Sequence, residues 1–277
     1  MHEPRLTRVE NRGCAFWSDE ALSMRSGVFV AFSERTGGLS RFPYRSLNLA
    51  SHVGDDEDRV DENRTRLLAA ADLSDLRDRL VTADQVHGSR VALIGRSEAG
   101  SGAWAGAHSP PVAATDVLVT TETDIPLMLL FADCVPVILV TLAGEGPVVA
   151  VVHAGWRGVL AGVAGAAART VSHVAACSGA DVLAYIGPHI CVDHYDVGPD
   201  IASQFSARFG TVSRAETGRL DLGAAVSQSL VEAGVAMSSQ CHLDACTAEQ
   251  TDRFFSHRAD GLTGRHGAIA VIRGRRA

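Results

Sequence analysis

Residues 151–158, with the sequence VVHAGWRG, constrain the fold of this chain more than any other segment. Apolar β-branched residues are typical of a buried strand, and here they lead directly into a glycine-rich helix start. A strand that ends at His153 and turns at once into a helix places that imidazole and Arg157 at the end of a sheet. Functional side chains gather at such ends, so we expect a site at this turn.

Four apolar segments at 115–120, 126–131, 135–141 and 148–153 are typical of consecutive buried strands. Residues 158–176 place apolar side chains at helical spacing, which predicts a helix. Further strands are expected at 27–32, 80–82, 90–94, 182–186 and 268–272, further helices from Asp55-Asp56 to about residue 71 and at 200–209 and 222–233, and a long surface loop at 98–114. Strands and helices do not alternate strictly. The order therefore favours an α+β layered sandwich of mixed β-sheets flanked by helices, in a single domain over residues 1–277.

Composition excludes several classes of protein. All 25 basic residues are arginine, so a Schiff-base lysine and a Walker-type phosphate loop are both impossible. A net charge of −7 argues against nucleic acid as a partner. Asp133 and two prolines interrupt the apolar stretch 125–142, which argues against a membrane span, and no secretory signal is readable. We expect a cytoplasmic protein whose six cysteines, none in a Cys-x-x-Cys pair, are reduced.

One thiol and two imidazoles form a candidate metal triad. His87, Cys134 and His153 each stand beside Gly, Asp or Pro at the predicted end or break of a strand. Taken singly, such residues more often pack in a core, and it is their shared position that favours a site. Thiolate and imidazole are the ligands that zinc prefers. Asp133, next to Cys134, is a candidate for proton transfer, with a structural role as the alternative.

Two arginines are candidates for anion binding. Arg157 opens the predicted helix a few residues after His153, where free backbone N–H groups and the helix dipole favour negative charge. Arg35 lies in the turn SERTGG at 33–38 and could add bidentate contacts to a phosphate or carboxylate. A solvated turn arginine is the alternative for Arg35.

Six groups of motifs carry a family resemblance. They are SERTGGLS with SLNLASHVGDD and ENR (33–64), QVHG (85–88), ADC (132–134), HAGWRG (153–158), IGP with Tyr195 (186–195), and CT followed by FFSHR and GRHGA (246–268). With these the chain resembles the YfiH family (DUF152), also called laccase-domain or multicopper polyphenol oxidase proteins and associated with purine nucleoside phosphorylase activity. The motifs span nearly the whole chain.

The resemblance implies a function and a set of site residues. It implies that His87, Cys134 and His153 bind Zn²⁺ and that Arg35, Asn48, Arg157 and Arg258 lie at or near the substrate pocket. We expect Cys134, His153, His87 and Asp133 to be the catalytic residues. The partners would be purine nucleosides and inorganic phosphate. Family members are described as phosphorolysing adenosine, inosine, guanosine and methylthioadenosine and as deaminating adenosine, and the resemblance implies a monomer.

Departures from the family pattern bear on base preference more than on the metal site. His257 stands where Tyr is usual, His266 stands where Gln is common, and the segment after IGP reads HICVDHYDV.

Other functions stay open at this point. A laccase with a trinuclear copper cluster would need His-x-His motifs, and none of the eleven histidines forms one, although Cu²⁺ could bind adventitiously to the N/S site. A cysteine-type hydrolase would use Cys134 as nucleophile and His153 as base. A peptidoglycan-precursor editing factor could use the same two residues. A purely structural zinc would need a fourth ligand, for which His52, His189 or Cys191 is available.

Overall fold

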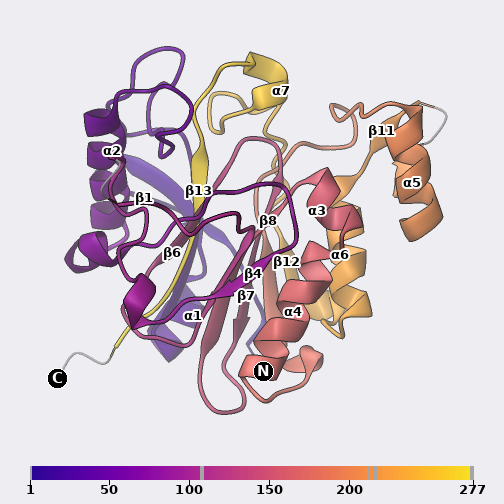
Figure 1. Cartoon of the computed structure of the whole chain (residues 1–277), viewed down its shortest axis with the longest axis horizontal. Helices are drawn as coiled ribbons and strands as arrows, with labels where there is room; N and C mark the ends of the chain where they lie inside the picture. Colours follow the sequence, from indigo (N-terminus) through magenta and orange to yellow (C-terminus); the bar gives the residue numbers. More distant parts are fainter. Residues whose placement is uncertain (1, 107–108, 211, 215–216, 275–277) are drawn as a thin grey trace.

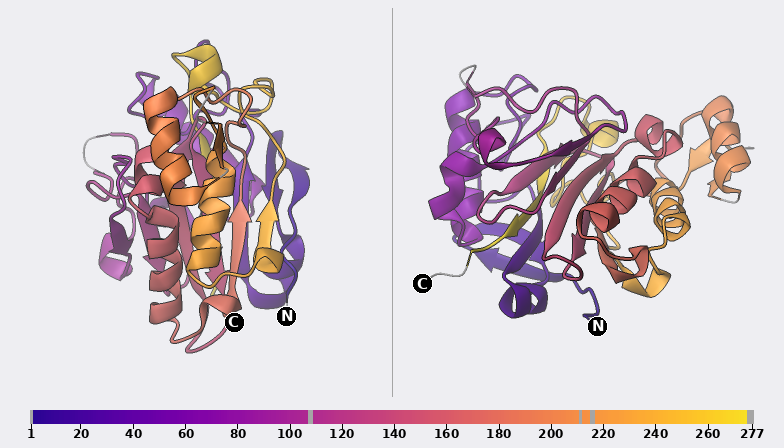
Figure 2. Two further views of the ribbon diagram at one scale, coloured as in Figure 1. Left: turned by 90° about the vertical axis from the view of Figure 1, so that its right-hand side faces the viewer. Right: turned by 60° about the horizontal axis from the view of Figure 1, so that its bottom comes forward.

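Two β-sheets stack on one another, and helices cover their outer faces (Figure 1). The computed structural model describes residues 2–106, 109–210, 212–214 and 217–274. In Figure 1, helix α2 lies on one side of the stacked sheets and α3, α4 and α6 lie on the other, and Figure 2 shows the same layers from two further directions. This arrangement confirms the predicted α+β layers with mixed sheets, and the single domain over 1–277 stays a prediction.

The first sheet has five strands and joins both ends of the chain. Its order is β1 (Thr7–Asn11), β2 (Cys14–Ser18), β3 (Val28–Ser33), β13 (His266–Ile272) and β6 (Leu127–Phe131). Every neighbouring pair is antiparallel. The C-terminal strand β13 is therefore an inner strand of the sheet, between β3 and the edge strand β6.

The second sheet has six strands and carries most of the predicted site. Its order is β12 (Gln240–His242), β9 (Val182–Ile186), β7 (Val135–Thr141), β8 (Val148–Ala154), β5 (Val117–Thr120) and β4 (Val91–Leu93). The four central strands are antiparallel, and the two edge strands β12 and β4 pair in parallel. A separate short hairpin pairs β10 (Ser213–Arg214) with β11 (Arg219–Leu220).

The helices lie outside the two sheets or at their ends. The α-helices are α1 (Glu20–Ser26), α2 (Glu57–Ala70), α3 (Trp156–Leu160), α4 (Val163–Val174), α5 (Pro199–Phe209), α6 (Leu222–Glu232) and α7 (His257–Asp260), and the 3-10 helices are η1 (Ser74–Arg79), η2 (Arg96–Glu98), η3 (Gly179–Asp181) and η4 (Met237–Ser239). Helix α2 begins where the Asp56 carboxylate accepts hydrogen bonds from the N–H groups of the first turn. Among the helices that the structure describes, none is both long enough and apolar enough to cross a bilayer.

The core explains why the central strands are continuous apolar runs. In β7, Ile138 and Val140 pack between the two sheets, whereas Val137 and Leu139 pack against the helices on the other face. Both faces of this strand are buried, so no polar alternation remains in its sequence. Leu67 and Leu68 of α2 cover the outer face of the five-stranded sheet in a third apolar cluster.

Several predicted elements differ from the structure. The helix expected over 158–176 begins earlier, at Trp156, and is broken into α3 and α4 at Gly162, whose φ of 81° is left-handed. Residues 80–82 form no strand, because Val81 makes only an isolated bridge to Leu127. Strand β6 belongs to the other sheet from β5, β7 and β8. The sequence analysis also missed the hairpin of β1 and β2 and helix α1.

Candidate metal and substrate site

The structure brings His87, Cys134 and His153 together at one end of the six-stranded sheet. One ligand atom of each lies within 4.8 Å of the ligand atoms of the other two. His153 is near the end of β8, and Cys134 directly precedes β7, in a register that pairs Val135 with Ala154. The His87 ring approaches from a turn, with its centroid 4.7 Å from that of His153. Segments that are distant in sequence therefore supply a cluster of three donors.

Asp116 organises two of the three donors. One of its carboxylate oxygens lies 2.8 Å from His153 Nδ1 and accepts a hydrogen bond from the His87 N–H at 3.0 Å. Its other oxygen accepts the Gly88 N–H at 2.7 Å. Asp116 is fully buried, directly before β5. A carboxylate on Nδ1 leaves Nε2 of His153 for a metal, as is usual for metal-binding histidines.

The electrostatics couple the thiol to the imidazoles. Burial alone would raise the pKa of the Cys134 thiol, but the adjacent His153 and His87 rings outweigh burial and hold that pKa below its usual range. For His153, burial lowers the pKa, while Cys134 and Asp116 outweigh it and raise the pKa above its usual range. The cluster thus favours a thiolate beside an imidazolium, and a thiolate is the form that binds metals and attacks electrophiles.

A glycine makes room for this cluster. A Cβ atom at Gly155 would lie 2.7 Å from His87 Cδ2 and 3.2 Å from Cys134 Sγ. Gly155 has φ −76° and ψ 164°, a conformation open to any residue, so lack of space and not backbone strain requires glycine here. At Gly158, a Cβ would lie 2.6 Å from the Gly88 carbonyl oxygen. Both glycines of the HAGWRG motif thus let the α3 turn approach the His87 turn closely.

The donor set fits a zinc ion with an open coordination position. Two imidazoles and one thiolate match the three protein ligands that catalytic zinc sites use. Among the described residues, no fourth His, Cys, Asp or Glu joins this cluster. Of the alternatives considered above, His52 lines the neighbouring cavity, His189 Nδ1 lies 2.8 Å from the Gly187 carbonyl, and Cys191 belongs to another cluster. Three donors without a fourth favour a catalytic over a structural ion.

The cluster lies at a cavity of about 760 Å³. Its lining includes Arg157, Arg258 and Arg265 besides the buried Arg64, together with Tyr195 and Trp156. The Arg157 guanidinium stacks on Trp156 at 4.4 Å and forms no salt bridge with any described residue. Arg258 lies 5.3 Å from the Tyr195 ring centroid. A cavity with aromatic walls and available guanidinium groups is suited to a planar ligand bound beside an anion.

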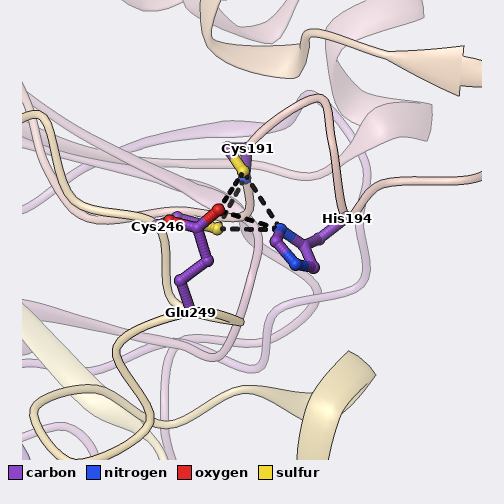
Figure 3. Close-up of side chains that lie close together, drawn as sticks. All are labelled: Cys191, His194, Cys246 and Glu249. Carbon is purple, nitrogen blue, oxygen red and sulfur yellow. Dashed lines mark hydrogen bonds and ion pairs between the residues drawn. The ribbon is translucent and has the colours of Figure 1, made fainter.

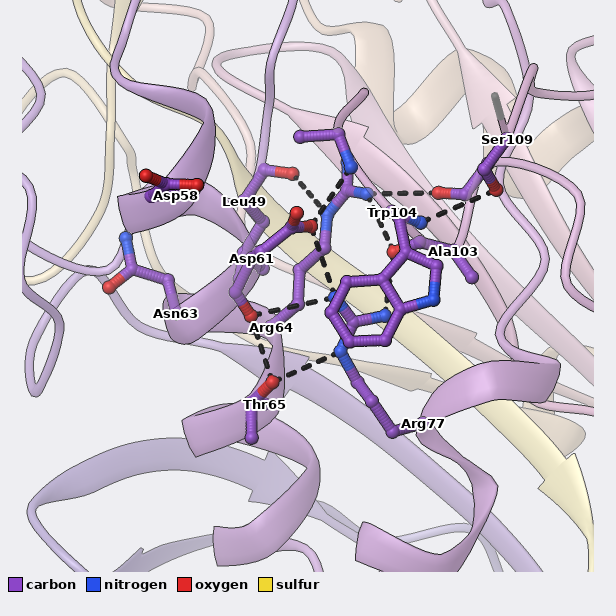
Figure 4. Close-up of polar contacts among 12 residues, drawn as sticks. Leu49, Asp58, Asp61, Asn63, Arg64, Thr65, Arg77, Ala103, Trp104 and Ser109 are labelled. Carbon is purple, nitrogen blue, oxygen red and sulfur yellow. Dashed lines mark hydrogen bonds and ion pairs between the residues drawn. The ribbon is translucent and has the colours of Figure 1, made fainter. Parts of the chain in front are cut away.

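Another part of the cavity lining is a loop fastened to α2 by the contacts shown in Figure 4. Arg64 is 3 % exposed and donates to the carbonyl oxygens of Leu49, Gly102 and Ala103. Arg77 also donates to Ala103, at 2.6 Å, and lies 3.9 Å above the Trp104 ring. Arg64 and Trp104 both line the cavity. The expected surface loop at 98–114, of which 107 and 108 lie outside the described residues, is therefore an anchored wall of the pocket.

Two of the four expected substrate residues, Arg35 and Asn48, do not line the cavity. The Arg35 guanidinium donates to the carbonyl oxygens of Arg45 and Thr251 and stacks on Phe255. Asn48 is fully buried, and its side-chain oxygen accepts the N–H of Arg265. In this structure, both residues hold the backbone of loops around the site.

Asp133 lies at the cavity, with its carboxylate turned to one loop. It accepts hydrogen bonds from the hydroxyls of Thr247 and Ser256, each at 2.7 Å, and from the Arg258 N–H at 2.6 Å. Its φ of 89° is left-handed. Its carbonyl oxygen accepts the N–H of Ile190. These bonds place Asp133 between Cys134 and the segments that carry Arg258 and Tyr195.

The sequence analysis missed Asp116 and Arg265. Asp116 lies at the start of the strand predicted over 115–120, where an acid is common as a turn residue, and nothing local distinguishes it. The antiparallel pairing of Val117 with Val152 sets it beside His153. Arg265 stands in the GRHGA motif, which was noted for its resemblance alone, and its guanidinium donates to the carbonyls of Thr263 and Gly264 at the cavity.

Comparisons with known proteins identify the family of this chain. Residues 29–273 match the family described as multi-copper polyphenol oxidoreductase laccase. The chain belongs to this family, which includes the YfiH and YlmD proteins. It is 37% identical over 244 residues to "Purine nucleoside phosphorylase SCO2081" of Streptomyces coelicolor, which covers 87% of this chain and 93% of that protein. It is 36% identical over 273 residues to "Purine nucleoside phosphorylase YlmD" of Geobacillus stearothermophilus, covering 95% of each.

Solved structures of the family share the fold. The crystal structure of YlmD from Geobacillus stearothermophilus superimposes with a TM-score of 0.86 at 32% identity, over 98% of this chain and 100% of that one. The structure of a Bacillus licheniformis YfiH protein gives a TM-score of 0.83 at 30% identity, over 95% of this chain and 97% of that one. The resemblance drawn from the motifs is thus confirmed for the family and for the fold.

Proposed function

We propose that this YfiH-family protein is a zinc-dependent purine nucleoside phosphorylase that also deaminates adenosine. The observation that supports the proposal best is the open cluster of His87, Cys134 and His153 at a cavity that also presents Arg157 and Arg258. The names of two relatives, from Streptomyces coelicolor and Geobacillus stearothermophilus, give the same phosphorylase activity. Adenosine, inosine, guanosine and methylthioadenosine are the substrates that we propose.

Phosphorolysis needs an anion held next to a ribose. A phosphate oxygen forms a bond to ribose C1′ while the bond from C1′ to purine N9 breaks. The electron pair of the broken bond leaves with the base. Arg157, Arg258 and Arg265 would orient the phosphate, because guanidinium groups bind its oxygens in pairs. Trp156 and Tyr195 offer aromatic surfaces to the base.

Deamination needs an activated water. The water oxygen adds to adenine C6, the bond from C6 to the exocyclic nitrogen breaks, and ammonia leaves. A zinc ion held by the three donors would supply a Lewis acid at this position. The protein's own contribution is orientation: Asp116 fixes the His153 ring, and its bonds to the N–H groups of His87 and Gly88 fix the turn that presents the His87 ring.

One observation favours a second candidate, a cysteine-type hydrolase. Cys134, His153 and Asp116 form a thiol, imidazole and carboxylate series, with Nδ1 of His153 2.8 Å from Asp116. This order matches the nucleophile, base and orienting group of cysteine hydrolases. Alkylation separates the two candidates. A zinc-bound Cys134 should resist iodoacetamide until a chelator is added, whereas a free catalytic thiolate should react at once.

Incubation with adenosine, with and without phosphate, tests the proposed function. Protein of known metal content should release adenine and ribose 1-phosphate only when phosphate is present, and should release inosine in either case, as identified by mass. Cys134→Ala should lose turnover and the zinc of the cluster at His87, Cys134 and His153, whereas Cys177→Ser, which changes a thiol outside the cluster, should keep both. Full turnover by Cys134→Ala, or unchanged adenosine with zinc-loaded wild type, would refute the proposal.

A further inference from the structure

A second cluster of metal-binding side chains lies apart from the first (Figure 3). Cys191, His194, Cys246 and Glu249 each present one ligand atom within 4.8 Å of the other three. Figure 3 shows the four side chains pointing toward a common centre, two from each of two loops. The first loop leads from β9 to α5, and the second leads from β12 to α7.

The fold brings these two loops together. Strands β9 and β12 are parallel neighbours, so their following loops leave the same end of the sheet. The two loops also pair through an isolated bridge between His189 and Cys246. Within each loop the two donors are three residues apart. One tight turn carries each pair, since the His194 N–H bonds to the Cys191 carbonyl and the Gln250 N–H bonds to the Cys246 carbonyl.

The separations within the cluster match those around a tetrahedral ion. His194 Nδ1 lies 3.3 Å from Cys191 Sγ, 3.8 Å from Cys246 Sγ and 3.3 Å from Glu249 Oε1. Cys191 Sγ lies 3.7 Å from the same carboxylate oxygen. Zinc bonds of ~2.0–2.3 Å at tetrahedral angles place neighbouring ligand atoms roughly 3.3–3.8 Å apart. The side chains therefore need little movement to enclose a zinc ion.

We propose that Cys191, His194, Cys246 and Glu249 bind a second zinc ion as a closed, structural site. Two thiols, one imidazole and one carboxylate complete the tetrahedral set that zinc favours, and four protein ligands leave no position for a substrate. The three-donor cluster at Cys134 has the opposite character, because one position stays open. The chain thus holds one catalytic and one structural arrangement of donors, and the second does not depend on the proposed function.

The second ion would tie down one wall of the cavity. Tyr195, which follows the ligand His194, lines the cavity. The Arg258 guanidinium donates to the His194 carbonyl at 3.3 Å, and Thr247, which follows the ligand Cys246, donates to Asp133. A zinc ion that joins the two loops would therefore hold Tyr195 and Arg258 in place without touching the substrate.

Metal counting on site variants tests this proposal. The full chain, purified under reducing conditions and loaded with Zn²⁺ alone, should hold two equivalents after excess metal is removed. Cys191→Ser and Glu249→Gln should each lower the binding to one tight equivalent of zinc. Cys134→Ala should also bind one equivalent, because it loses the zinc ion of the other cluster. The double variant Cys191→Ser/Cys134→Ala should hold none. Cys177→Ser, a thiol change outside both clusters, should still hold two.

Retention of one equivalent by Cys191→Ser also shows that this variant is folded. Two results would overturn the proposal. In one, the reduced wild type holds a single equivalent that Cys134→Ala alone removes. In the other, Cys191→Ser and Glu249→Gln both keep two equivalents with unchanged affinity in competition with a chromophoric chelator. A disulfide between Cys191 and Cys246, seen by mass in unreduced protein, would count against the site if reduction did not restore the second equivalent.

Discussion

Gly155→Ala tests whether the first cluster depends on close approach of the α3 turn. The Cβ atom of the new methyl group would lie 2.7 Å from His87 Cδ2, which is closer than the 3.4 Å at which ordinary van der Waals contact begins. The His87 ring must therefore retreat by about 0.7 Å, whereas metal–ligand distances tolerate changes of only ~0.2 Å. Alanine adopts the φ and ψ of Gly155 without strain, so displacement of His87 is the main expected effect.

The displacement should weaken zinc binding, and the overpacking should lower the stability of the fold by a similar amount. Loss of a group that orients a ligand lowers metal affinity by about 10–100-fold, and we expect a weakening of this size, which corresponds to ~1.4–2.7 kcal/mol. Zinc affinity can be measured by competition with a chromophoric chelator, and folding by denaturant unfolding of the metal-free protein. Overpacking of this kind costs the fold about 1–3 kcal/mol at most sites.

Gly95→Ala is the matched control. Gly95 also has a negative φ, of −103°, and its Cβ would meet only the end of the flexible Glu98 side chain at 3.4 Å. This variant should bind zinc as the wild type does. The reasoning fails if Gly155→Ala remains folded and binds zinc with wild-type affinity, because His87 would then not need its present position.

Four further predictions follow from the same contacts. Asp116→Asn should weaken zinc binding about 10–100-fold by removing the carboxylate on His153, with Asp58→Asn on the surface of α2 as the neutral control. Arg157→Gln should raise the KM for phosphate by roughly 10–100-fold in the adenosine assay, since a charge-assisted hydrogen bond contributes ~1.5–3 kcal/mol. Thermal stability should stay unchanged, because Arg157 forms no salt bridge with any residue that the structure describes. Burial raises the pKa of Glu34, but hydrogen bonds from Arg8 and Arg253 outweigh burial and lower that pKa, so the native state binds fewer protons than the unfolded state. The free energy of unfolding should therefore fall as the pH drops below about 4.5. Glu34→Gln should flatten this pH dependence, as measured by urea titrations. If Asp133 only positions its neighbours, Asp133→Asn should lower thermal stability and raise the KM for the nucleoside, and the pH profile of kcat should stay unshifted. Loss of one limb of that pH profile would instead assign proton transfer to Asp133.

The sequence predicted the strands that are buried on both faces far better than the edges of the fold. Strands β7 and β9 coincide with the apolar segments 135–141 and 182–186, because every residue in them is buried. Strand β1 was missed for the opposite reason. Its sequence, TRVEN, is largely exposed and polar, and only its pairing with β2 makes it a strand. Helix α1 buries a single residue, Leu22, and so has no apolar stripe to detect.

Pairing between strands decides what could be known of the site. Cys134 and His153 were selected by their position at strand ends, and the β7–β8 register places those ends side by side. Nothing in the local sequence identifies Asp116 as a site residue, because its role depends on the register between β5 and β8, which cannot be predicted from the sequence. The same limit applies to Cys191. It was a possible fourth ligand for the first cluster, and only the pairing of β9 with β12 assigns it to the second.

Asp133 shows how the two clusters can be coupled through one residue. Its left-handed φ turns the chain just before Cys134, and its carbonyl accepts the Ile190 N–H from the loop that holds Cys191. Its carboxylate binds Thr247, which adjoins Cys246, and the N–H of Arg258. A left-handed conformation of a residue other than glycine costs energy and persists only when its surroundings fix it. Loosening either loop would therefore relax Asp133 and with it the backbone that presents the Cys134 thiol. Loss of the second metal should thus lower the zinc affinity of the first site, which still holds its one equivalent, even though the two sites share no ligand.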